Sequence, residues 1–173
     1  MRILLSAALA LSLPTGLLAA GGGNETAPSK PKCENGQVYD KKTKTCVDAK
    51  ESSLQLQDRY EAVRAYAHAG QYEAAQTVLA AMPQDDDRTL TYLGFTTRKM
   101  GDMERGMAHY RAALTRNPGN ILARSYMGQA LVEQGDVPAA LAQLRALRGA
   151  GGSGTWAEAS LRRAIATGVT YSY

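Results

Sequence analysis

The chain has 173 residues, a formal net charge of +4 and two cysteines. This length predicts a single domain of ordinary size. The basic excess is mild: it suits an acidic partner but does not demand nucleic acid, so we predict no nucleic-acid binding.

Residues 1–20 have the pattern of a secretory signal peptide. Arg2 precedes an apolar run over residues 3–13, and small residues follow at 19–20. The run is shorter than the roughly 20 residues that span a bilayer, which favours cleavage over a retained membrane anchor. We therefore expect an exported protein of the bacterial periplasm, with no integral membrane segment after cleavage. Residues 21–32 are rich in Gly, Pro and Lys and predict a flexible tether.

The two cysteines, Cys33 and Cys46, follow this segment. An even number in an exported chain predicts that they pair, and a closed loop of about 14 residues contributes ~3 kcal/mol in the chain-entropy model. A metal site is disfavoured, because two thiolates need further ligands. The turn-forming pair Asn35 and Gly36 then predicts a small disulfide-closed β-hairpin over residues 33–50. Two roles stay open for it, a local staple or a separate ligand-binding element.

From residue 53 onward, apolar residues recur at the three- and four-residue spacings of amphipathic helices. Gly101 and Gly135 are 34 positions apart, and so are Gly94 and Gly128. The second pair would lie where paired helices come closest. The pattern predicts three helix-turn-helix units over residues 53–148, with glycine turns at Gly70, Gly101 and Gly135.

A helix-turn-helix unit that repeats every 34 residues is the signature of the tetratricopeptide repeat, and the chain resembles that family over about 95 residues. The first unit is degenerate, since Val63 stands where the packing glycine should be. The resemblance implies an all-α fold, a right-handed superhelix of about three repeats preceded by the hairpin. The residues that carry the resemblance are Leu93, Gly94, Gly101, Asp102, Tyr110, Ala113, Leu114 and Pro118 in the middle unit, and Met127, Gly128, Leu131, Gly135, Asp136, Ala140 and Leu144 in the third.

For residues 149–173 the sequence predicts a Gly-rich link, a capping helix and a short tail. Thr155 and Glu158 form a capping-box pattern at the start of that helix, and a repeat array needs such a cap to cover its last apolar face. The run over residues 149–154 formally matches the G-x-G-x-x-G dinucleotide fingerprint. It follows a predicted helix rather than a strand, so we do not expect it to bind phosphate.

No catalytic or metal-binding constellation is recognisable. His68 and His109 fall in different helices, without cysteines or carboxylate pairs at ligand spacing. The acidic run at 85–87 lacks the spaced ligands of a calcium loop. We therefore predict that the protein is not an enzyme and that it binds no cofactor or metal.

The resemblance instead implies a partner-binding groove on the concave face, lined by the first helix of each repeat. Basic and aromatic side chains there suit a protein or peptide segment with acidic groups, as an adaptor in envelope assembly or maintenance would bind. The alternatives are a solvated charged face, or repeats that self-associate in a structural envelope protein; the oligomeric state stays open. Phe95 is expected at the groove surface. By position the groove comprises Tyr60, Arg64, His68, Arg88, Thr91, Phe95, Arg98, Lys99, Ser125, Gln129 and Glu133.

Overall fold

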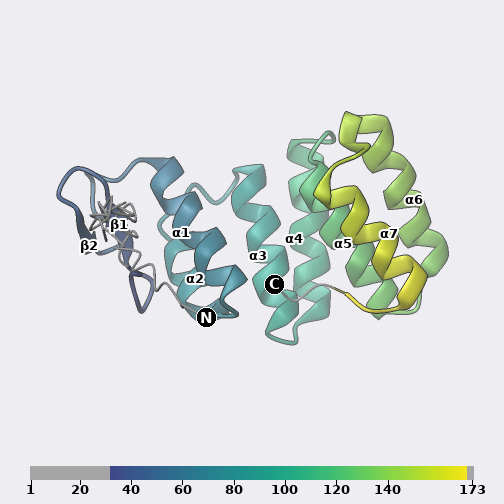
Figure 1. The fold of residues 1–173 in the computed structure, drawn as a ribbon, viewed down its shortest axis with the longest axis horizontal. Helices are drawn as coiled ribbons and strands as arrows, with labels where there is room; N and C mark the ends of the chain where they lie inside the picture. Colours follow the sequence, from purple (N-terminus) through teal and green to yellow (C-terminus); the bar gives the residue numbers. More distant parts are fainter. Residues whose placement is uncertain (1–31, 171–173) are drawn as a thin grey trace, which may run out of the picture.

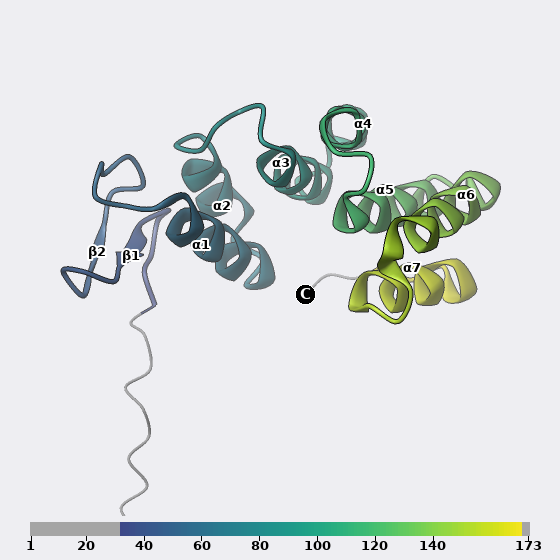
Figure 2. The same cartoon turned by 90° about the horizontal axis from the view of Figure 1, so that it is seen from above.

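A computed structural model describes residues 32–170. The predicted signal peptide, nearly all of the tether and the last three residues lie outside this range. The described chain forms a small hairpin followed by a row of helices, which bends into an arc (Figures 1 and 2). Within this range, none of the helices combines the length and the apolar character that crossing a membrane requires. The predicted all-α repeat fold is confirmed.

The helices pack in antiparallel pairs, and α3 and α5 lie on the inner side of the arc while α4 and α6 lie on its outer side (Figure 2). A short π-helical turn, η1, links the last pair to the final helix. The elements in chain order are β1 (Val38–Asp40), β2 (Thr45–Val47), α1 (Leu56–His68), α2 (Tyr72–Leu79), α3 (Asp87–Lys99), α4 (Met103–Arg116), α5 (Ile121–Glu133), α6 (Val137–Leu147), η1 (Arg148–Gly152) and α7 (Trp156–Thr167).

Glycine turns and aspartate caps build the second and third helix pairs in the same way. Gly101 and Gly135 have φ angles of 99° and 79°, a conformation that a side chain would strain. The next residue is an aspartate in both pairs. Asp102 accepts a hydrogen bond from a backbone N–H of α4 and Asp136 from one of α6, both at 3.0 Å. The Gly-Asp pair therefore ends one helix and begins the next.

Two further glycines lie where helices approach most closely. A Cβ atom added at Gly94 would lie 2.5 Å from the ring of Tyr110 in α4, the partner helix of its own pair. At Gly128 it would lie 2.6 Å from Leu161, which belongs to α7. The first contact is the expected one within a pair. The second differs, because α7 packs directly onto α5.

Buried polar contacts connect successive units. The amide of Gln76 in α2 donates to the Thr96 hydroxyl of α3 at 3.2 Å. The amide of Gln129 in α5 donates to the Ser160 hydroxyl of α7 at 3.1 Å. A buried donor left without its partner costs about 1–3 kcal/mol. These contacts therefore favour one register of each unit against the next.

The hairpin packs against α1 at the N-terminal end of the helical row (Figure 2). Its predicted disulfide is confirmed, with Cys33 and Cys46 joined. Val38 of β1 is buried in the main apolar core, and the Tyr66 hydroxyl of α1 donates to the Gln37 carbonyl at 2.9 Å. The hairpin is thus an N-terminal cap built from strands rather than from a helix.

One arginine fixes the segment between the hairpin and α1. The guanidinium of Arg59 donates to the carbonyls of Ala49 at 2.7 Å, Glu51 at 2.8 Å and Leu54 at 3.0 Å. Ala49 and Leu54 are themselves buried. The segment has no regular secondary structure, so these three contacts take the place of a ladder of backbone hydrogen bonds.

Candidate partner-binding groove

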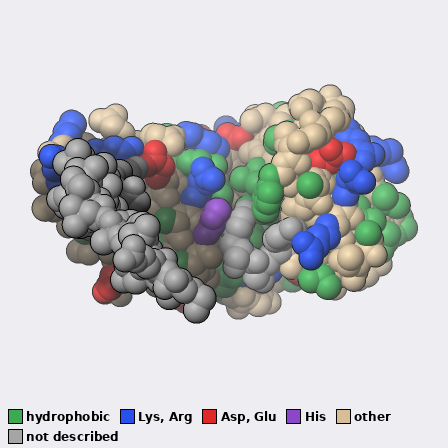
Figure 3. Space-filling model, viewed as in Figure 1, with side chains coloured by type: hydrophobic (Ala, Val, Ile, Leu, Met, Phe, Trp, Pro, Cys, Tyr) green, Lys and Arg blue, Asp and Glu red, His purple; other side chains and the backbone are tan. Residues whose placement is uncertain are grey.

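The inner side of the arc holds a cavity of about 380 Å³. It lies between the first helix, α1, and the last helix, α7. Figure 3 looks onto this side, where basic, histidine and hydrophobic side chains gather near the middle. The cavity is lined by Tyr60, Arg64 and His68 of α1, Tyr92 of α3, Leu122 of α5 and Trp156 of α7.

Tyr60, Arg64 and His68 were expected in the groove, and the structure brings them together there. The other three lining residues were not predicted. Trp156 belongs to the capping helix. The groove residues were predicted from equivalent positions in the three repeats, and this helix is not one of those repeats. It is the single tryptophan of the chain, and it is 46% exposed. An exposed tryptophan in the first turn of the predicted cap was the available signal.

Several other predicted groove residues lie in the core instead. The expectation that Phe95 is exposed is wrong: its side chain is 1% exposed. It packs against the rings of Tyr72, Tyr92 and Tyr126. The reason is the position of α3, which has neighbouring helices on both sides as well as its own partner α4. Little of its surface remains for the groove.

The buried polar residues among them have structural partners. The hydroxyl of Thr91 donates to the backbone carbonyl of Asp87 at 2.6 Å. Gln129 is fully buried and donates to Ser160, as described above. Ser125 is also buried, and its hydroxyl donates to a backbone carbonyl of α7 at 2.8 Å. Ser125 and Gln129 thus hold α5 against α7, while Thr91 bonds within α3, and none of the three side chains reaches the groove surface.

The expected basic centre of the groove is neutralised from within the chain. The Arg98 side chain is 1% exposed, and its Nη1 lies 3.4 Å from a carboxylate oxygen of Glu133. Lys99 lies 3.9 Å from the other oxygen of the same carboxylate. Burial, followed by the charge of Arg98, lowers the pKa of Lys99. The pair therefore offers little free charge to an external acidic group.

Arg88 is also engaged. Its guanidinium lies over the ring of Tyr60, 5.1 Å from the centroid, and its Nε lies 3.6 Å from a carboxylate oxygen of Asp86. A cation over an aromatic face is held by the ring quadrupole. Arg88 thus helps to orient Tyr60, which lines the groove cavity.

Arg64 is the cation of the groove that no carboxylate neutralises. It is exposed, and within residues 32–170 it forms no ion pair. Burial raises the pKa of Tyr92, while the charge of Arg64 and a hydrogen bond with it act in the opposite direction. Burial and the charge of Arg64 lower the pKa of His68, which favours the neutral imidazole near pH 7. The groove therefore presents one positive charge among aromatic rings.

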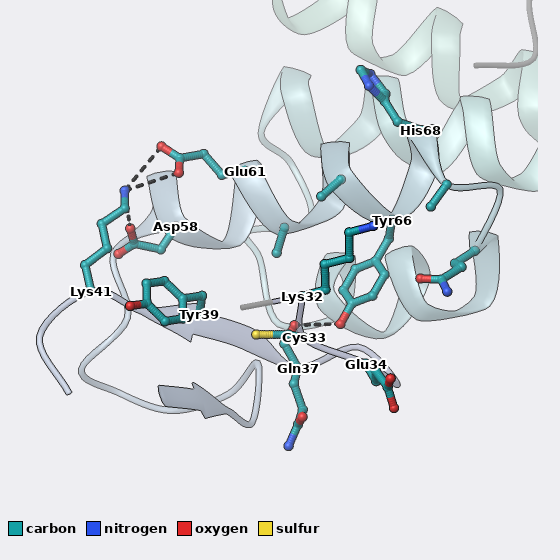
Figure 4. A pocket seen from close by; sticks show the side chains of 14 residues that line it. Lys32, Cys33, Glu34, Gln37, Tyr39, Lys41, Asp58, Glu61, Tyr66 and His68 are labelled. Atoms are coloured by element: carbon teal, nitrogen blue, oxygen red, sulfur yellow. Dashed lines mark hydrogen bonds and ion pairs between the residues drawn. The ribbon is translucent and has the colours of Figure 1, made fainter. Parts of the chain in front are cut away.

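A second and larger cavity, of about 620 Å³, lies between the hairpin and α1 (Figure 4). Lys41 crosses one end of it, 2.8 Å from Asp58 and 3.2 Å from Glu61. His68 lies at the other end. Apolar atoms also line the cavity, from Ala62 and Ala65 of α1 and Cys33 of the disulfide. Over residues 32–170, no three His, Cys, Asp or Glu side chains are grouped so that they could hold a metal ion.

Comparison with known proteins identifies part of this fold. Residues 98–162 match the tetratricopeptide repeat family. The match begins at the end of α3 and ends within α7, so it includes α4, the third helix pair and the first part of the capping helix. No curated protein and no solved structure matches the chain. A tetratricopeptide repeat is typical of protein–protein interaction scaffolds, which are usually not catalytic.

Proposed function

We propose that the protein is a non-catalytic, exported scaffold that binds a segment of another protein in its concave groove. The observation that carries this proposal is the cavity between α1 and α7, where Arg64 stands without a carboxylate partner among aromatic side chains. Repeat proteins bind on such extended concave surfaces. Buried aromatic anchors and arginines supply most of the binding energy at protein interfaces.

The side chains that line the groove indicate which residues the bound segment contains. Arg64 suits a carboxylate, which a guanidinium binds through two parallel hydrogen bonds. Leu122 and Trp156 suit an apolar or aromatic side chain on the opposite side of the cavity. We therefore propose an extended segment with an acidic residue next to an apolar one. The neutralised pair Arg98 and Lys99 is not part of this recognition.

Two features support export. The disulfide belongs to proteins of oxidising compartments, and residues 1–20 have the composition of a signal peptide. We propose the bacterial periplasm as the location and envelope assembly or maintenance as the context.

Site-specific crosslinking tests the groove assignment. A photoreactive amino acid replaces Leu122 in the groove or, as the matched control, the exposed Leu141 of α6. The segment crosslinked at position 122 is identified, synthesised and titrated against the Arg64→Glu and Arg111→Glu variants; Arg111 lies exposed on α4. We expect Arg64→Glu to weaken binding by at least about tenfold, which is ~1.4 kcal/mol, and Arg111→Glu to leave it unchanged. Equal weakening by both variants, or crosslinking at position 141 alone, would reject the groove.

The larger cavity favours a second candidate function, in which the hairpin and α1 bind a separate ligand. Its volume falls within the range of small-molecule sites. The substitution Ala65→Trp fills this cavity from an exposed position of α1. If the cavity is a site, this substitution abolishes ligand binding while binding at the groove persists. Binding that survives the substitution excludes this second function.

A further inference from the structure

The chain turns back toward the groove after α7. Gly168 ends this helix in the left-handed conformation, with φ of 71°, and its N–H donates to the Ala164 carbonyl at 2.8 Å. The next N–H, of Val169, donates to the Thr167 hydroxyl at 3.2 Å. The turn is therefore fixed by hydrogen bonds at each successive residue.

The returning chain is held by a polar contact. The Thr170 hydroxyl donates to the carboxylate of Glu133, the last residue of α5. This is the carboxylate that lies between Arg98 and Lys99 of α3. Val169, in contrast, is 65% exposed. The chain is thus attached at the lower end of the concave face, at the junction of α5 and α3.

Residues 171–173 continue from this point, and their sequence is Tyr-Ser-Tyr. Three residues reach about 10 Å when extended, and packed helices have axes about 8–10 Å apart. From Thr170 beside Glu133 of α5 the segment can therefore reach α3. That helix contributes Tyr92 to the groove cavity.

The groove chemistry matches tyrosine side chains. Tyr60 and Tyr92 already contact each other edge to face, with ring centroids 5.6 Å apart. Tyr92 makes a second edge-to-face contact, with the ring of Tyr126. Further rings extend such a cluster at favourable geometry, and the Arg64 guanidinium can stack on a ring or donate to a phenol oxygen.

We propose that residues 171–173 dock in the concave groove of their own chain, with Tyr171 and Tyr173 against the aromatic side chains of the cavity. The tail is then an internal occupant, which an external segment has to displace. This competition rests on the function proposed above, whereas the docking itself does not. A protein whose binding-competent state is only partly populated shows an apparent affinity reduced by that fraction.

Trp156 allows the docking to be measured without any partner. It is the single tryptophan, it lines the cavity and it is 46% exposed. Acrylamide quenching of its fluorescence is compared in the full chain, in the double variant Tyr171→Ser and Tyr173→Ser, and in the control Val169→Ser. Circular dichroism verifies that all three fold alike. We expect quenching to increase in the double variant and not in the control. Equal quenching in all three proteins overturns the docking.

A second measurement separates the two proposals. The affinity of the segment identified by crosslinking is determined for the full chain and for the double variant. Competition predicts binding about tenfold tighter without the two tyrosines. If quenching increases but the affinity is unchanged, the tail docks and the partner binds elsewhere, which overturns the groove function alone. If neither changes, the docking is overturned while the groove function stands.

Discussion

The two ends of the repeat array are covered by different means. At the N-terminal end a disulfide-closed hairpin packs on α1, and the Arg59 guanidinium ties down the connecting segment. At the C-terminal end α7 continues the helical array and packs on α5 through buried residues such as Leu161. Only the second cap contributes a side chain, Trp156, to the groove cavity. The helical cap thus contributes to the concave groove, whereas the hairpin cap forms a separate cavity with α1.

The largest effect should come from the C-terminal cap. Leu161 is fully buried and fills the space above Gly128. The substitution Leu161→Ala leaves a cavity, and we expect it to lower the free energy of unfolding by about 2–5 kcal/mol. Urea denaturation followed by circular dichroism measures the loss. The exposed leucine of α6, changed in the same way by Leu141→Ala, is the control and should lose far less. Similar losses in both variants would contradict a packed cap.

The N-terminal cap should depend on its covalent bond. Replacing Cys33 and Cys46 by serine removes the cross-link, and the chain-entropy model gives a loss of ~3 kcal/mol. Because each unit contacts only its neighbours, the loss should be concentrated near the hairpin. Hydrogen exchange of individual amides tests this location. Protection lost to the same extent in α6 as in α1 would show that the two caps belong to one cooperative unit.

Acid should weaken both caps, because carboxyl groups at each end have a lowered pKa in the folded protein. Hydrogen bonds lower the pKa of two carboxyl groups at the N-terminal end, that of Asp40 chiefly through the Lys42 N–H and that of Asp58 chiefly through Lys41. At the other end the Gly154 N–H and Arg148 lower the pKa of Glu158. A carboxyl group whose pKa is lowered by folding stabilises the protein above its unfolded pKa. This contribution is lost as the pH falls through the folded pKa.

The acid effect can be localised with two matched variants. Asp58→Asn and Glu158→Gln each remove one of these titrating groups while keeping the side-chain shape. The free energy of unfolding is measured between about pH 6 and pH 2 for both and for the unchanged chain. We expect both variants to flatten the acid dependence. A variant that keeps the full slope would show that its carboxyl group does not contribute to acid unfolding.

A smaller effect is expected where the chain leaves α7. Gly168 has φ of 71° and no neighbouring atom within 4 Å of an added Cβ. The substitution Gly168→Ala should therefore cost only the backbone strain, about 1 kcal/mol. Gly149 also has open space but no positive φ, so Gly149→Ala is the matched control and should be nearly neutral. Equal thermal midpoints for the two variants would mean that the turn is not strained.

The repeat fold was predictable because its signals are local. Gly101 and Gly135 each begin a Gly-Asp turn, and the distance between them along the sequence equals the length of one repeat. The cysteine pairing was predictable from the even number of cysteines and the expectation of export. These features depend on the backbone conformation of a few consecutive residues, which the amino-acid types determine.

The groove was less predictable because it depends on which side of each helix remains uncovered. Phe95 and Gln129 occupy positions on the first helices of their repeats, yet both are buried by neighbouring helices. Arg64 and His68 remain exposed because α1 is the first helix of the array and has fewer neighbouring helices. Spacing along a helix does not reveal how many other helices surround it.

One residue links the two cavities of the molecule. His68 lines both the groove between α1 and α7 and the cavity between α1 and the hairpin. If both cavities bind ligands, an occupant of one that fixes this imidazole in a single rotamer would change the free energy of binding in the other, equally in both directions. The last turn of α1 is the place where such coupling between the cap and the concave face would arise.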